Sequence, residues 1–174
     1  MLKLVTGGAS SGKSAFAENL VTTSGINPRA YVACMMVRDG EDELRVARHR
    51  ALRVSKGFLT IEAPTELRSV AFPQSGVVLI EDIANLAANE CFSTKQGWNG
   101  AKERILSGVV MAKETCALTV AVTCEIAADG IGYDALTQRY IALLAEVNAA
   151  IAALADEAYE VVCGLPIVLK GGRA

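Results

Sequence analysis

The stretch GGASSGKS, residues 7–14, constrains the fold of this chain more than any other feature of its sequence. It has the pattern G-x-x-x-x-G-K-S, with the apolar run LKLVT before it and a segment of helical periodicity after it. Glycines allow backbone N–H groups to turn toward phosphate oxygens, and the N-terminus of the following helix faces the same anion. Lys13 can then reach the β- and γ-phosphates of a nucleotide, and the Ser14 hydroxyl can bind magnesium. The alternative is a tight strand-to-helix turn that happens to contain a lysine and a serine.

Short apolar runs alternate with helix-period segments along the rest of the chain. The expected strands are LKLVT, AYVACM, FLTIEA, VVLIED and LTVAVTC. This alternation predicts an α/β fold with parallel strands, crossover helices and a sheet buried on both faces. In the final run YEVVCGLPIVLK, Gly164 and Pro166 separate two apolar segments, which predicts an antiparallel hairpin at one edge of the sheet. The length of 174 residues, 52% of them hydrophobic, predicts one domain over residues 1–174.

Composition excludes several classes of function. A net charge of -2 gives no reason to expect a nucleic-acid partner, so we expect a small anionic ligand. The N-terminus does not have the pattern of a signal peptide, and no run approaches the roughly 18 apolar residues of a membrane span, so we expect a cytoplasmic protein. The five cysteines lack C-x-x-C spacing and accompany a single histidine, which predicts reduced, mostly buried thiols and no zinc site.

Two acidic residues, Glu81 and Asp82, follow the buried run VVLI. A phosphate loop usually works with a carboxylate at the end of a neighbouring strand, which holds magnesium directly or through water. We therefore expect Ser14, Glu81 and Asp82 to form the metal site. The alternative is that these carboxylates end a strand and cap the next helix.

The segment EDELRVARHRALR, residues 41–53, contains the only histidine of the chain, His49. As a helix it would place Arg45, His49 and Arg53 on one face, because residues four apart are neighbours on a helix. Positive neighbours disfavour the imidazolium, so the ring stays neutral and nucleophilic, and the arginines can bind an incoming triphosphate. The alternative is a solvated histidine on an arginine-rich surface helix.

A further set of motifs runs through most of the chain in a fixed order. They are GGASSGKS, YVAC, DELRVARHR, TIEAP, VVLIED and ALADEAYEVVCGLPIVLK. In these motifs the chain resembles the bifunctional adenosylcobinamide kinase and adenosylcobinamide-phosphate guanylyltransferase family of cobalamin biosynthesis. The resemblance implies a RecA-like P-loop fold, with a mostly parallel sheet covered by helices on both faces. It also implies a homo-oligomer, usually a trimer.

The resemblance assigns two activities and a set of site residues. It implies phosphorylation of adenosylcobinamide by a nucleoside triphosphate, with GTP and ATP both open as donors and Mg²⁺ as the cofactor, and transfer of GMP from GTP through a guanylylated histidine. The catalytic residues are then Lys13 and His49. The nucleotide-binding residues are Gly7, Gly8, Ala9, Ser10, Ser11, Gly12, Lys13, Ser14, Ala33, Cys34, Met35, Arg50, Ala51, Leu52, Arg53, Glu62 and Glu81.

The sequence also departs from the family pattern. Ser10 stands where family loops usually have arginine, and the segment CEIAADGIGY has Cys124 and Ala127 in place of an asparagine and a glycine. Asn148 is kept, although the arginine–aspartate pair and the glutamine of the family are missing around it. Two alternatives therefore stay open: a P-loop kinase for another small alcohol, and a catalytically silent nucleotide-binding regulator.

Overall fold

One seven-stranded sheet forms the centre of the protein in the computed structural model, which describes residues 1–36, 55–126 and 132–171. The strands are β1 (Leu2–Thr6), β2 (Arg29–Ala33), β3 (Phe58–Glu62), β4 (Val77–Glu81), β5 (Leu118–Val122), β6 (Glu157–Val162) and β7 (Leu165–Lys170). The helices are α1 (Lys13–Thr23), the short 3-10 helix η1 (Leu67–Ser69), α3 (Ile83–Phe92), α4 (Ala101–Thr115) and α5 (Ala135–Leu154). The five apolar runs of the sequence all contain strands, as predicted.

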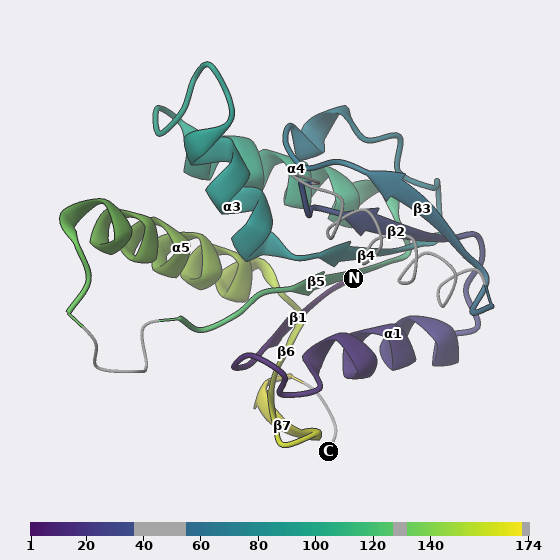
Figure 1. The fold of residues 1–174 in the computed structure, drawn as a ribbon. Helices are drawn as coiled ribbons and strands as arrows, with labels where there is room; N and C mark the ends of the chain where they lie inside the picture. The colour runs from purple at the N-terminus through teal and green to yellow at the C-terminus, as the bar shows by residue number, and fades with distance from the viewer. Residues whose placement is uncertain (37–54, 127–131, 172–174) are drawn as a thin grey trace.

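The strand order is β3-β2-β4-β5-β1-β6-β7, and every neighbouring pair is parallel except β6 and β7. This confirms the predicted mostly parallel sheet with an antiparallel hairpin at one edge. Helix α1 covers one face, and α3, α4 and α5 cover the other (Figure 1). All five residues of β5 are buried, because side chains from both faces of a central strand meet helices.

Strand β4 shows how the alternation of side chains positions a functional residue. Val78 and Ile80 join the core beneath α3, α4 and α5, whereas Val77 and Leu79 join the core beneath α1. Glu81 continues the second row, because residues two apart in a strand share a face. Its carboxylate is therefore directed toward the side of the sheet where α1 begins.

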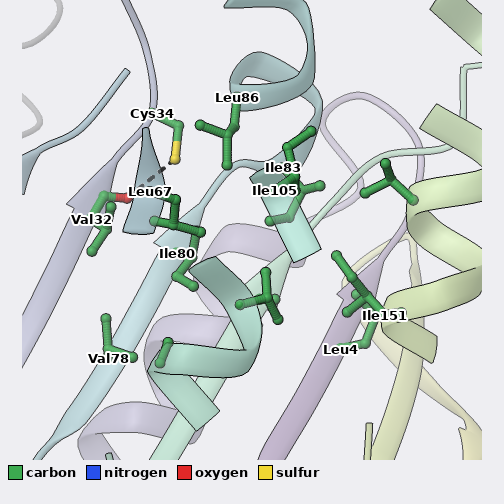
Figure 2. Close-up of a cluster of buried hydrophobic side chains, with 14 of the residues drawn as sticks. Leu4, Val32, Cys34, Leu67, Val78, Ile80, Ile83, Leu86, Ile105 and Ile151 are labelled. Carbon is green, nitrogen blue, oxygen red and sulfur yellow. Dashed lines mark hydrogen bonds between the residues drawn. The ribbon is translucent and has the colours of Figure 1, made fainter. Parts of the chain in front are cut away.

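The larger core contains an especially close contact between η1 and α4. Figure 2 shows Leu67 and Ile105 packed with Ile80 and Leu86 in this core. A Cβ atom added to Gly108 of α4 would lie 2.7 Å from the Leu67 Cβ. Glycine at this position lets η1 sit directly on the helix.

Parallel strands bring their carboxyl ends to the same edge of the sheet. The loops after β1, β2, β4 and β5 therefore open on one side, which is where ligands bind in open α/β sheets. No helix in the described ranges is both long and apolar enough to cross a membrane.

Candidate active site

The loop of residues 7–14 connects β1 to α1 and has a backbone that requires glycine. Gly7 has a φ of 150° and Gly12 a φ of 93°, which side-chain-bearing residues rarely adopt. A Cβ atom on Gly7 would also lie 2.5 Å from the carbonyl oxygen of Val161. Helix α1 begins at Lys13, directly after Gly12, so the loop leads into a helix N-terminus that favours an anion. We call residues 7–14 the phosphate loop.

Ser14 and Glu81 meet across the sheet edge although they are far apart in sequence. The Ser14 hydroxyl donates a hydrogen bond to Glu81 Oε1. The other carboxylate oxygen, Glu81 Oε2, is buried and has no hydrogen-bond partner within the described part of the chain. Lys13 Nζ lies over the same loop and donates to the Gly8 carbonyl oxygen at 3.0 Å. The predicted lysine, serine and carboxylate are thus brought together.

Burial disfavours the ionised forms of the Glu81 and Asp82 carboxyl groups. It raises the pKa of Glu81, and the nearby Asp82 charge raises it further, while the hydrogen bond from Ser14 and a weaker interaction with Tyr31 oppose the shift. Burial also raises the pKa of Asp82, although its hydrogen bonds from Asn85 and the charge of Lys13 lower it. A cation placed here would stabilise both charged carboxylates.

The two acidic residues have different structural roles. Asp82 is the N-cap of α3, and its Oδ1 accepts from the Asn85 N–H at 2.6 Å. Its Oδ2 accepts from the Asn85 side chain at 3.2 Å. Because both Asp82 oxygens are engaged, the geometry favours Glu81 as the metal-binding carboxylate, and the capping alternative describes Asp82.

The donor set fits magnesium better than a metal that needs a complete protein cage. The described residues contain no group of three or more histidine, cysteine, aspartate or glutamate side chains able to hold a metal. Mg²⁺ usually takes one or two protein oxygens and completes its shell with water and substrate phosphates. Ser14 Oγ and the unpaired Glu81 oxygen supply that kind of partial shell.

A second group of predicted residues lies at the ends of β2 and β3. Ala33 is opposite Glu62 on one side and Glu81 on the other. Cys34 donates its N–H to the Glu81 carbonyl at 2.8 Å, and its own carbonyl accepts from the Asn89 side chain at 2.8 Å. Four strand spacings separate β3 from β1, or about 19 Å. Glu62 therefore cannot touch the phosphates that the loop binds, and could only contact a more distant part of a nucleotide.

The remaining predicted site residues are only partly covered by the structure. Met35 follows this strand end and is half-buried. His49 and the residues predicted beside it, numbers 50–53, lie outside the described residues. Their assignment stays a prediction.

One support of the phosphate loop was not predicted from the sequence. The two-residue turn between β6 and β7 consists of Cys163 and Gly164, both with positive φ. The Gly164 N–H donates to the Ser11 carbonyl at 2.8 Å, and a Cβ on Gly12 would lie 3.2 Å from the Gly164 Cα. The hairpin therefore packs against the outside of the loop. The dipeptide Cys-Gly between two apolar runs signalled a turn but not what the turn would contact.

The cysteines are free thiols, as predicted from their spacing. Cys34, Cys91 and Cys116 are buried, Cys124 is half-buried and Cys163 is exposed. Burial raises the pKa of the Cys34 thiol, which keeps it protonated and unreactive.

A glycine loop between β1 and α1, with its serine joined to a carboxylate at the end of β4, defines a P-loop nucleotide-binding protein of the RecA-like class. The solved structures similar to this one include the flagellar accessory protein FlaH from Methanocaldococcus jannaschii. It has a TM-score of 0.52 and 14% identity, over 99% of this chain and 80% of that chain. The RadB recombinase has a TM-score of 0.50 and 16% identity, over 91% of this chain and 73% of that chain.

Sequence comparison identifies the family. Residues 3–169 match the model of the cobinamide kinase / cobinamide phosphate guanyltransferase family, so the chain belongs to this family. The bifunctional adenosylcobalamin biosynthesis protein CobP of Pseudomonas aeruginosa is 32% identical over 98% of both chains. The bifunctional adenosylcobalamin biosynthesis protein CobU of Escherichia coli is 29% identical over 98% of this chain and 100% of that protein.

Proposed function

We propose that the chain carries out both steps of its family, phosphorylating adenosylcobinamide and then transferring GMP from GTP to the phosphate formed. Membership of the family over residues 3–169 carries this proposal. The pairing of Ser14 with Glu81 beside Lys13 adds the chemical parts that the first step needs. These parts argue for an active enzyme over a silent regulator.

In the kinase step, the phosphate loop holds the triphosphate and the acceptor alcohol attacks its γ-phosphorus. The O–P bond to the acceptor forms as the bond to the β–γ bridging oxygen breaks, and the hydroxyl proton is released. Loop N–H groups and Lys13 neutralise charge on the leaving diphosphate. Mg²⁺, held through Ser14 and Glu81, would supply further neutralisation. GTP is the proposed donor, and ATP is the alternative donor.

In the transferase step, a neutral His49 nitrogen attacks the α-phosphorus of GTP. A P–N bond forms, pyrophosphate leaves, and the imidazole proton is released. The phosphate oxygen of cobinamide phosphate then attacks the same phosphorus, which breaks the P–N bond and regenerates the histidine. The proposal for His49 is supported by the sequence motif and the family, with residues 50–53, Ala33, Cys34, Met35 and Glu62 as the proposed nucleotide contacts.

Replacing Lys13 by Ala tests the kinase assignment. The backbone cradle stays, but the point charge on the β- and γ-phosphates is lost, so phosphorylation should fall roughly 100-fold or more. The measurement is mass spectrometry of cobinamide phosphate formed with Mg²⁺ and GTP or ATP. Equal turnover in both proteins would remove the phosphate loop from the mechanism, and tight GTP binding by the native protein without any turnover would favour the silent regulator.

The assembly and location are also proposals. Family resemblance favours a homotrimer, which sedimentation equilibrium of the native protein tests directly. A cytoplasmic location agrees with a biosynthetic enzyme that uses nucleotides, and it stays a prediction.

A further inference from the structure

Aromatic side chains, one of them exposed and two half-buried, gather between the end of α3 and the start of α5. We call this the aromatic surface, and it consists of Phe92, Trp98, Leu136, Arg139 and Tyr140. The Phe92 ring centroid lies 5.3 Å from that of Trp98 and 6.4 Å from that of Tyr140. Arg139 stacks over Trp98 at 4.4 Å. Phe92 and Leu136 are each 51% exposed, and Trp98 and Tyr140 are half-buried, so part of this aromatic cluster is accessible to a ligand.

The surface is held in place by an ion pair whose carboxylate is buried and whose arginine is partly exposed. Glu90 is only 1% exposed, and its Oε2 accepts from Arg104 Nε at 2.6 Å. The same arginine donates to the carbonyl oxygens of Gly97 at 2.8 Å and Asn99 at 2.5 Å, on either side of Trp98. Burying a charge is costly unless it is paired, so this arrangement ties the loop that carries Trp98 firmly to α3 and α4. A rigid aromatic surface loses little entropy when it binds a ligand.

The aromatic surface is continuous with the candidate active site. The Tyr140 hydroxyl donates to the Ala84 carbonyl at 2.8 Å, in the first turn of α3. Asp82 caps that turn, and Lys13 lies close enough to lower the pKa of its carboxyl. From Asp82 to Phe92 the helix extends about 15 Å, at a rise of 1.5 Å per residue. A ligand that reaches both places must be long and largely apolar.

The geometry points to the aromatic surface as the binding site for the corrin ring of cobinamide while its alcohol reaches the phosphate loop. This inference rests on the proposed function. Seven single bonds separate the alcohol oxygen from the ring, a reach of about 9 Å at bond lengths near 1.5 Å. The ring then extends over the end of α3, where Phe92 and Trp98 can contact its apolar faces. The Arg139 guanidinium can donate to the amide carbonyls at the ring periphery.

Steady-state phosphorylation of cobinamide by the full-length chain tests this assignment. Phe92→Ala and Trp98→Ala should each raise the KM for cobinamide roughly tenfold, as expected for an aromatic anchor, and leave the KM for the triphosphate unchanged. Trp98→Phe should restore most of the affinity because it keeps an aromatic face. Leu59→Ala is the matched control, since Leu59 is 67% exposed on the far edge strand β3 and should change neither constant.

The outcomes separate this inference from the proposed function. If the native protein does not phosphorylate cobinamide, the proposed function fails and this inference fails with it. If the native protein is active and the KM for cobinamide in both alanine variants stays within about twofold of the native value, the aromatic surface is not the ring site. Sedimentation of the same variants tests whether a second copy of the chain covers the surface instead. If the alanine variants form smaller assemblies than the native protein while the KM for cobinamide is unchanged, the aromatic surface is a contact between copies of the chain.

Discussion

Glu81 is a buried carboxylate whose charge is costly unless a cation lies beside it. Because burial raises its pKa, the folded state holds the proton more tightly than the unfolded state does. Its favourable contribution to stability is therefore fully present below the ordinary value of 4.5 and is lost as the pH rises through the folded-state pKa. Glutamine keeps the shape and cannot ionise. Glu81→Gln should raise the melting temperature at pH 8, measured without magnesium, and have no such effect near pH 4.

The same substitution should impair catalysis while stabilising the fold. Without the carboxylate, Ser14 is the remaining protein oxygen of the proposed magnesium shell, so the variant should need more Mg²⁺ for half-maximal phosphorylation. Titrating Mg²⁺ at saturating triphosphate measures this requirement, and Asp82→Asn serves as the comparison. An unchanged requirement in Glu81→Gln together with a raised one in Asp82→Asn would contradict our choice between the two residues.

At the level of elements, the C-terminal hairpin is a support for the phosphate loop. Inserting two glycines after Gly164 should release its hydrogen bond to Ser11 and leave the sheet intact. The loss of one such bond is worth about 1 kcal/mol, so we expect triphosphate binding to weaken roughly fivefold in calorimetry. Cys163→Asn is the control, because asparagine suits a positive φ and keeps the two-residue turn. Native affinity in the insertion variant would show that the loop holds its shape unaided.

Helices α3 and α4 are joined by the ion pair of the buried Glu90 and the partly exposed Arg104. Arg104→Met should lower the free energy of unfolding by about 3–5 kcal/mol, because it leaves a buried carboxylate without its cation. Urea denaturation measures this change. Adding Glu90→Gln removes the unpaired buried negative charge and keeps an oxygen that accepts a hydrogen bond from the Glu66 N–H. The double variant should therefore recover part of the lost free energy of unfolding. A double variant no more stable than Arg104→Met would contradict the electrostatic explanation.

On the scale of the whole molecule, the strands were predictable because each follows a local rule. Buried parallel strands appear in the sequence as continuous apolar runs. A central strand such as β5, which is buried on both faces, does not alternate between apolar and polar residues. The hairpin was predictable from Gly164 between two apolar runs, although the second run, β7, is antiparallel and largely exposed. The strand order was not, because the position of β5 between β1 and β4 depends on packing over the entire sheet. That order is what places Ser14 beside Glu81.

The site was predictable where a motif has a fixed local geometry. Residues 7–14 form the expected loop because glycine conformations and a helix N-terminus are short-range features. The sequence predicted both Glu81 and Asp82 in the metal site, and only the structure shows that Asp82 caps a helix. The aromatic surface was missed because Phe92 and Tyr140 come from helices far apart in sequence. Glu90, a charged residue within the apolar pattern of α3, was the one signal in the sequence that pointed there.

The central claim is that this chain is a bifunctional enzyme whose second step passes through a guanylylated histidine. The most direct test is intact-mass spectrometry of the protein after incubation with Mg²⁺ and GTP and without a corrinoid. We predict one GMP per chain in an acid-labile linkage, absent in His49→Asn and discharged by adding cobinamide phosphate. A native protein that binds GTP but never gains GMP would contradict the guanylyltransferase assignment, even if the phosphate loop still supports phosphorylation.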